Sequence, residues 1–334
     1  MTARTKHSPH RSSLGYRRSR ASSHKPKVRG WPKYEGDPKI LAFPGFKAGM
    51  TRLIYKEDSP KSHLANTDRI TAVTVIETPP VILMGMRTYK QTPYGLKILA
   101  EAKIQSPSKH IKRIKVRFPD EEKYKEQLKK VEETADQAVQ LRAIIHTQPD
   151  LTGIGTKKPS IFEIRVGCRN ASEGIEWLKE RMGKELQIED FTKPGQYVDV
   201  IGITKGKGFQ GPVKRHGVTL LQHKSKHTKR GVGSIAPWTP ARVQWVLPRY
   251  GQLGYFRRTE YNKRVMLIGT NPDEINPKGD FIKYGKVRNR YVLLKGSVPG
   301  PKKRMVILRD GVRSQNKLIA EPRITFVSQE SHMR

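Results

Sequence analysis

The segment between Val200 and Thr259 contains no aspartate or glutamate, although it carries twelve lysines and arginines. Glycine, proline, histidine and tryptophan are interleaved with these cations. Glycine and proline are poor helix formers, and the uncompensated positive charges of the segment repel one another. The segment is therefore not expected to fold unaided. A phosphate backbone would neutralise this charge, and the segment therefore indicates a polyanionic partner.

The composition of the whole chain agrees with this interpretation. Its 334 residues include 66 Lys and Arg against 30 Asp and Glu, a formal net charge of +36. Membrane surfaces also attract basic proteins, but such proteins add a lipid anchor, a span or an amphipathic helix. The apolar run from Val81 to Met86 is far shorter than the roughly 18 residues that a bilayer span needs. We therefore expect a soluble protein with a nucleic-acid partner and no membrane partner.

Two motifs in the sequence resemble patterns found in cofactor-binding or metal-binding proteins. The glycines from Gly206 to Gly211 match the dinucleotide pattern GxGxxG, but Pro212 and Gly217 disfavour the long helix that must follow. No acidic residue for a ribose appears before Glu260. The single cysteine, Cys168, excludes an internal disulfide and a cysteine-based zinc site within the chain.

His223 and His227 are four residues apart, as two zinc ligands on a helix would be. No glutamate lies between them and no cysteine is near, so the metal signal is weak and contact with nucleic acid is favoured. The basic segment has no paired carboxylates for acid–base catalysis. We expect no enzyme activity, cofactor, metal or small-molecule substrate.

Trp238 stands between Pro237 and Pro240, which stiffen the backbone on either side of the indole. Stacking of such a ring on a base contributes about 1–3 kcal/mol in single-strand binders. Packing on its own loop is the alternative, but the acid-free surroundings favour RNA contact. Trp245, which precedes Val246 and Leu247, is assigned to local packing.

The first 34 residues contain ten Lys or Arg and no acid. An organellar transit peptide has a similar composition, but Pro9, Pro26 and Pro32 interrupt the amphipathic helix that such peptides form. A basic arm is therefore the preferred interpretation.

Short β-branched apolar runs separated by turn residues begin near Ile40, which predicts a mainly β framework in a sandwich or barrel. The expected strands are Lys39 to Phe43, Thr51 to Lys56, Arg69 to Glu77, Val81 to Tyr89, Leu96 to Ala102, Ile161 to Val166, Tyr197 to Thr204, Arg264 to Gly269, Phe281 to Tyr284, Tyr291 to Lys295 and Arg304 to Leu308.

Two helices are expected between these strands. The first covers Pro119 to Thr147, with apolar residues near helical spacing from Tyr124 to Ile145 and acids at its start. Asn170 or Ser172 caps the second.

This pattern predicts three parts. Residues 1–38 form a basic N-terminal arm. Residues 39–204 and 260–334 form a β body with a helical insertion at about residues 105–190. Residues 205–259 form a basic central extension, because about 55 residues without regular pattern exceed an ordinary loop.

A series of motifs in this order resembles the universal large-subunit ribosomal protein three family over essentially the full chain. The long basic N-terminal arm and the helical insertion are similar to its archaeal and eukaryotic branches, and the short C-terminal end favours the archaeal branch. The motifs are Gly45 to Thr51, Thr204 to Gly211, Lys214 to Gly217, Pro237 to Val243, Gly251 to Tyr255 and Arg258 to Lys263.

The resemblance implies a translation-protein-like β-barrel that is a structural constituent of the large subunit in the cytoplasmic ribosome. It implies binding to large-subunit (23S-type) rRNA and to neighbouring ribosomal proteins, and a role in early subunit assembly. It also places the extension near the peptidyl transferase centre, with Trp238 close to the aminoacyl-tRNA path.

The basic and aromatic residues of the arm and the extension are the candidate RNA-binding residues, and we expect them to recognise phosphate geometry more than base sequence. They are Arg4, Lys6, Arg11, Arg17, Arg18, Lys25, Lys27, Lys205, Lys207, Phe209, Lys214, Arg215, His216, Lys224, Lys226, His227, Lys229, Arg230, Trp238, Arg242, Gln252, Arg257 and Arg258.

Two other classes of protein share a strongly basic composition. An RNA-modifying enzyme could use the β body as a platform, but the sequence lacks a recognisable catalytic constellation. A chromatin-like DNA compactor would prefer duplex DNA, whereas the expected protein should prefer RNA with tertiary structure.

Overall fold

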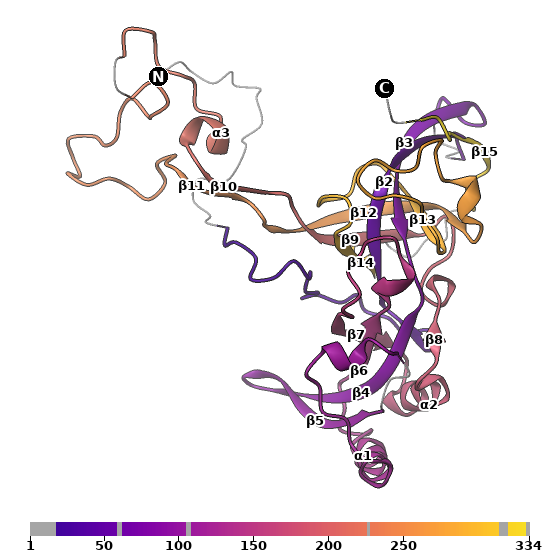
Figure 1. Cartoon of the computed structure of the whole chain (residues 1–334). Helices are drawn as coiled ribbons and strands as arrows, with labels where there is room; N and C mark the ends of the chain where they lie inside the picture. Colours follow the sequence, from indigo (N-terminus) through magenta and orange to yellow (C-terminus); the bar gives the residue numbers. More distant parts are fainter. Residues whose placement is uncertain (1–17, 59–61, 105–107, 226–227, 314–319, 332–334) are drawn as a thin grey trace. The chain divides into compact units, whose positions relative to one another are not determined.

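The computed structural model describes residues 18–58, 62–104, 108–225, 228–313 and 320–331 (Figure 1). The chain divides into two compact units. The described part of the smaller unit comprises residues 18–24 and Ile203–Arg258, and the larger unit comprises the described parts of Lys25–Gly202 and Thr259–Arg334.

A seven-stranded sheet forms much of the larger unit. Its strands, in spatial order, are β14 (Met305–Asp310), β9 (Tyr197–Ile203), β12 (Arg257–Gly269), β13 (Tyr291–Lys295), β3 (Asp68–Glu77), β2 (Ala42–Lys56) and β15 (Ile324–Val327). Strand β14 also pairs with β2, so Leu308 lies opposite Val200 on one side and Phe43 on the other.

A second, six-stranded sheet lies in the same unit. Strands β1 (Lys39–Ile40), β7 (Ile161–Gly167), β6 (Gln140–Thr147), β4 (Val81–Thr92) and β5 (Gly95–Lys103) follow one another, and β8 (Glu185–Leu186) pairs with β4. Helix α1 (Glu121–Glu133) packs on β5, and helix α2 (Ala171–Arg181) packs on β6 and β4. Short 3-10 turns occur at η1 (Ile111–Arg113), η2 (Pro149–Leu151), η3 (Ile188–Asp190) and η4 (Pro272–Glu274).

One hydrophobic cluster joins the two sheets. It contains Phe43 and Val200 from the seven-stranded sheet and Leu83 and Ile164 from the six-stranded sheet, all at 0 % exposure. A second cluster gathers side chains of the seven-stranded sheet and of the turns beside it. These β-branched and aromatic residues explain the mainly β fold, because they pack well on pleated surfaces.

In the smaller unit, β10 (Gly206–Gln210) and β11 (Gly251–Gly254) form a two-stranded antiparallel sheet. Helix α3 (Pro212–His216) follows β10 and has only five residues. Gly217 ends it in the left-handed conformation, with φ 72°, as expected where glycine follows the last helical turn.

Most of the strands expected from the sequence are confirmed to within a few residues, including β3, β4, β5, β7, β9, β13 and β14. The strand expected over Phe281 to Tyr284 is wrong. These residues form a turn, and only an isolated bridge joins Phe281 to Gly285. Phe281 and Tyr284 are buried although they lie in a turn, and Tyr284 donates a hydrogen bond to the buried carboxylate of Glu77.

The helix expected over Pro119 to Thr147 is correct only in its first half. Helix α1 ends at Glu133, and the chain then forms strand β6 from Gln140. Strand β6 pairs with β4 on one side and β7 on the other, and this tertiary pairing overrides the local helical spacing. The second helix is confirmed as α2, which follows Asn170 at its N-cap.

No helix among the residues that the structure describes is long and apolar enough to cross a bilayer.

Candidate nucleic-acid interface

The β10–β11 hairpin positions the two ends of the acid-free segment. Gly206 lies opposite Gly254, and Gln210 lies opposite Gly251. Gly254 has φ +72°, and a Cβ there would lie 2.1 Å from the carbonyl oxygen of Lys205. A side chain cannot be accommodated at this position, so the glycine is needed for close approach of the two strands.

The GxGxxG motif therefore forms a strand and not a dinucleotide-binding turn. Its glycines belong to β10 and to the residue before α3, and α3 is too short to present an extended helix dipole to a pyrophosphate. This agrees with the rejection of a dinucleotide site from the sequence.

Arg215 fixes helix α3 to the hairpin. Its Nε donates to the carbonyl oxygen of Gln252 at 3.2 Å, and its Nη1 donates to the carbonyl oxygen of Arg249 at 3.0 Å. Burial and the charge of Arg215 lower the pKa of His216. The two hydrogen bonds of Arg215 hold helix α3 against the end of the acid-free segment that leads into β11.

Gln252 is also engaged within the segment, since its Nε2 donates to the carbonyl oxygen of Gly254 at 3.0 Å. The hydrogen-bonding groups of Arg215 and Gln252 thus meet backbone atoms of the chain itself. Sequence reasoning assigned both residues to RNA alone.

The structure separates the candidate residues by exposure. Trp238 is 95 % exposed and Phe209 is 74 % exposed, so neither ring is needed for the core. The exposed candidates are Arg18, Lys27, Lys205, Lys207, Phe209, Lys214, Lys224, Lys229, Arg230, Trp238 and Arg242. The half-buried candidates are Lys25, Arg215, His216, Gln252, Arg257 and Arg258. Arg4, Lys6, Arg11, Arg17, Lys226 and His227 lie outside the described residues.

One lysine of the N-terminal stretch lies near a second lysine. Lys25 is half-buried beside Lys158, and burial together with this neighbouring charge lowers the pKa of Lys25.

Cation and aromatic pairs line the smaller unit, and sequence reasoning missed them. Arg249 lies 5.5 Å from the ring centre of Tyr250, and that ring lies 5.7 Å from Phe209. Arg20 lies 5.5 Å from the ring of Tyr255. Arg249 and Tyr250 are consecutive, so the sequence could have indicated that pair, whereas Arg20 and Tyr255 come together only in the folded unit.

The backbone contact beside Arg20 brings the N-terminal residues to the hairpin. The amide of Ala21 donates to the carbonyl oxygen of Tyr255 at 2.9 Å. Two basic stretches that are far apart in the sequence therefore meet in one unit.

The assignment of Trp245 to local packing is wrong, because its side chain is 62 % exposed. With Trp238, Phe209 and Tyr250 it belongs to a set of exposed aromatic rings in a segment without acids. Exposed flat rings among cations are suited to stacking on bases.

Within the described ranges, no group of three or more His, Cys, Asp or Glu side chains is arranged to hold a metal ion. His223, one half of the histidine pair that the sequence raised, is exposed on the segment. The arrangement offers cations, aromatic faces and backbone groups. The β body and this acid-free hairpin segment together define a basic structural protein of the nucleoprotein class.

The chain belongs to the Ribosomal protein L3 family, whose model matches residues 1–333. This confirms the resemblance seen in the sequence. The family is a structural component of the ribosome and not an enzyme.

Three archaeal relatives, each named large ribosomal subunit protein uL3, show how far the similarity extends. The chain is 47% identical over 326 residues to that of Methanococcus aeolicus, covering 97% of each chain. It is 44% identical over 327 residues to that of Methanocaldococcus jannaschii, again with 97% of each chain covered. The relative from Methanobrevibacter smithii is 40% identical over 330 residues, with 97% of this chain and 98% of the relative covered.

Proposed function

We propose that this protein is a structural constituent of the large ribosomal subunit that binds large-subunit (23S-type) rRNA. The observation that carries the proposal is the acid-free segment from Val200 to Thr259, in which Trp238 is 95 % exposed. The twelve cations of this segment have no carboxylate within it to neutralise them. The phosphates of an RNA backbone would neutralise these cations, and binding releases the counterions that had condensed on the RNA.

Residues 1–38 and 205–259 act as a basic arm and a basic extension in this proposal. The amide of Ala21, which meets the hairpin at Tyr255, supports the view that both stretches approach RNA together. Exposed lysines and arginines neutralise phosphates, and the exposed rings of Phe209 and Trp238 stack on unpaired bases.

The body, residues 39–204 and 260–334, is proposed to be a translation-protein-like β-barrel with an insertion at about residues 105–190. The pairing of β14 with both β2 and β9 supports closure of the larger sheet. A closed sheet has no open edge that could pair with another chain, which suits a protein packed among many neighbours.

The proposal extends to the position of the protein in the cytoplasmic ribosome. The extension reaches between rRNA helices toward the peptidyl transferase centre, and the body contacts neighbouring ribosomal proteins. Binding several rRNA segments at once would also support early assembly of the subunit. The relatives' names, which place them in the large subunit, support this position.

Sedimentation tests the proposal directly. A tagged copy of the full chain should sediment with large subunits from a cell lysate and should leave them only at high salt. Recovery of most of the tagged protein at the top of the gradient in low salt would contradict a structural role in the subunit.

Competition separates RNA binding from DNA binding. At one fixed salt concentration, protein-free large-subunit rRNA should displace a labelled rRNA fragment more effectively than duplex DNA does. The reverse order would support a DNA compactor. Raising the salt should weaken binding with a slope of about 0.7–0.9 for each neutralised phosphate.

A further inference from the structure

Three arginines lie side by side across one face of the six-stranded sheet. In the strand register Arg87 of β4 is opposite Arg142 of β6, and Arg142 is opposite Arg165 of β7. On the other side of β4, Glu101 of β5 is opposite Arg87. Directly opposite residues of antiparallel strands share a face, so the three guanidinium groups form one row.

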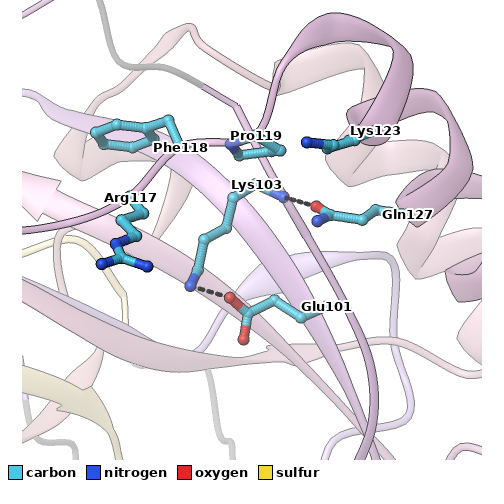
Figure 2. A pocket seen from close by; sticks show the side chains of 7 residues that line it. All are labelled: Glu101, Lys103, Arg117, Phe118, Pro119, Lys123 and Gln127. Atoms are coloured by element: carbon cyan, nitrogen blue, oxygen red, sulfur yellow. Dashed lines mark hydrogen bonds and ion pairs between the residues drawn. The ribbon is translucent and has the colours of Figure 1, made fainter.

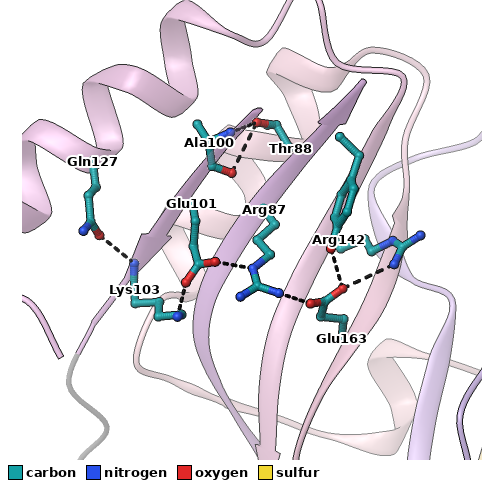
Figure 3. A network of polar contacts seen from close by, with 9 residues as sticks. Arg87, Thr88, Ala100, Glu101, Lys103, Gln127, Arg142 and Glu163 are labelled. Carbon is teal, nitrogen blue, oxygen red and sulfur yellow. Dashed lines mark hydrogen bonds and ion pairs between the residues drawn. The ribbon is translucent and has the colours of Figure 1, made fainter. Parts of the chain in front are cut away.

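Two carboxylates neutralise only part of this row (Figure 3). Arg87 bonds to both Glu101 and Glu163. Glu163 also accepts from Tyr89 Oη at 2.7 Å and from Arg142 Nη1 at 3.3 Å. The same two acids therefore serve several donors, and Arg142 Nε, which is buried, has no hydrogen-bond partner among the described residues.

Arg165 is the member of the row without an acid. Among the residues that the structure describes, no carboxylate forms an ion pair with it, and its Nη1 lies 3.5 Å from the carbonyl oxygen of Pro32. Burial and the charge of Arg142 lower the pKa of Arg165. Like charges on directly opposite residues destabilise a sheet, so this arrangement is unfavourable for the fold alone.

The positive surface continues past the edge strand β5. A recess of about 390 Å³ between β5 and the start of α1 is lined by the cations Lys103, Arg117 and Lys123 (Figure 2). Phe118 and Pro119 supply its apolar wall. Lys103 also pairs with Glu101, so the recess and the arginine row share that carboxylate.

We infer that this face, the arginine row and its recess, binds the phosphodiester backbone of RNA as a contact surface outside the acid-free segment. The inference rests on the proposed function and specifies a second surface for the same partner. Six cations and the carboxylates of Glu101, Glu163 and Asp120 leave a net positive surface.

The arginines favour phosphate over other anions on this protein. A guanidinium fork matches two oxygens of a phosphate group, and the chain belongs to a ribosomal family, in which phosphate is the abundant neighbouring anion. An acidic protein segment is the competing occupant.

The test measures binding of the full-length protein to protein-free large-subunit rRNA over a series of salt concentrations. Arg165→Gln should weaken binding about tenfold at low salt, the loss expected for one charge-assisted hydrogen bond. It should also reduce the salt slope by about 0.7–0.9, the contribution of one neutralised phosphate. Arg165→Lys keeps the charge and should keep the slope.

Arg290→Gln is the matched control. Arg290 already pairs with Glu189 at 3.0 Å, so its replacement removes the same charge from a site that is neutralised within the chain. Its slope and affinity should equal those of the wild type.

Thermal unfolding of the free protein separates a binding role from a structural role. Arg165→Gln should melt at the wild-type temperature or above it, because the substitution removes repulsion from Arg142. A clear fall in melting temperature would show that Arg165 is kept for the fold and would overturn the inference.

The other outcomes of the binding test separate a failure of this inference from a failure of the proposed function. If the wild type binds rRNA and Arg165→Gln binds it with equal affinity and slope, the inference fails while the proposed function stands. Normal rRNA binding combined with loss of Arg165→Gln from assembled particles would also overturn it, in favour of an acidic protein partner. Failure of the wild type to bind rRNA at any salt would refute the proposed function itself.

Discussion

Arg309 Nη2 donates a hydrogen bond to Asp199 Oδ2 at 2.6 Å, and the two side chains are only 6% and 0% exposed. Asp199 also accepts from the backbone amides of Asn262 at 3.0 Å and Val312 at 3.1 Å. Arg309 Nη1 donates to the carbonyl oxygen of Gly30 at 2.6 Å. One buried ion pair therefore holds together β9, β14, the middle of β12 and the residues before β1.

Replacing one partner of this pair should be costly. Asp199→Asn leaves the guanidinium of Arg309 buried without its counter-charge, and we expect a loss of about 3–5 kcal/mol in the free energy of unfolding. Denaturant unfolding measures this loss. Asp136→Asn, at an exposed position, is the control and should change stability little. Equal effects of the two substitutions would show that the buried pair does not stabilise the body.

Gly254→Ala should disrupt the hairpin without unfolding the body. The new Cβ would lie 2.1 Å from the Lys205 carbonyl oxygen, at a φ of +72° that alanine rarely adopts. We expect faster proteolytic cleavage within the acid-free segment and an unchanged melting temperature. Gly211→Ala is the matched control, because nothing lies within 4 Å of its Cβ position. Cleavage rates that do not differ between the two variants would contradict the hairpin.

Trp238→Ala should leave stability unchanged, because the indole is 95 % exposed and contributes little to a core. The same variant should alter the activity of large subunits that contain it. Trp177→Ala provides the contrast, since Trp177 packs against the main core cluster and its loss should cost about 2–4 kcal/mol. A large drop in melting temperature for Trp238→Ala would assign this residue to the fold instead.

Acid should weaken the fold through His146. The side chain is 0 % exposed, and burial lowers its pKa below the ordinary value of 6.5. The unfolded chain therefore binds the proton more readily, so the stability from neutral His146 is complete above about pH 6.5 and is lost as the pH falls.

Urea midpoints measured at about pH 7 and about pH 5.5 check this, since the interval spans the ordinary titration of histidine. The fall between the two should be smaller in His146→Leu than in the wild type. His223→Gln, at an exposed position, should keep the wild-type difference. A wild-type fall that His146→Leu reproduces in full would assign the effect to other groups.

Much of the β framework could be predicted because its strands carry their own local signal. Strand β13 is a short apolar run bounded by turn residues, and its expected limits, Tyr291 to Lys295, are those observed. Strand β6 could not be predicted, because the residues from Leu141 to Ile145 fit a helical spacing as well as a strand. Its pairing with β4 and β7, which are distant in the sequence, decides between the two.

Because β6 was expected to be helical, the sequence did not predict the arginine row. Arg142 was expected on a helix, so nothing in the sequence placed it beside Arg87 and Arg165. For Arg215 the sequence suggested RNA contact, but it did not indicate that the guanidinium donates hydrogen bonds to two carbonyl oxygens within the segment.

The sequence by itself determined the distribution of charge, including the acid-free segment, and the family to which the chain belongs. Net charge and local apolar pattern are properties of consecutive residues, so they can be read without a fold. Only the tertiary structure decided which cations face outward, as Lys207 does, and which are held inside, as Arg309 is. That division depends on strand register and burial, which are set by contacts between residues far apart in the chain.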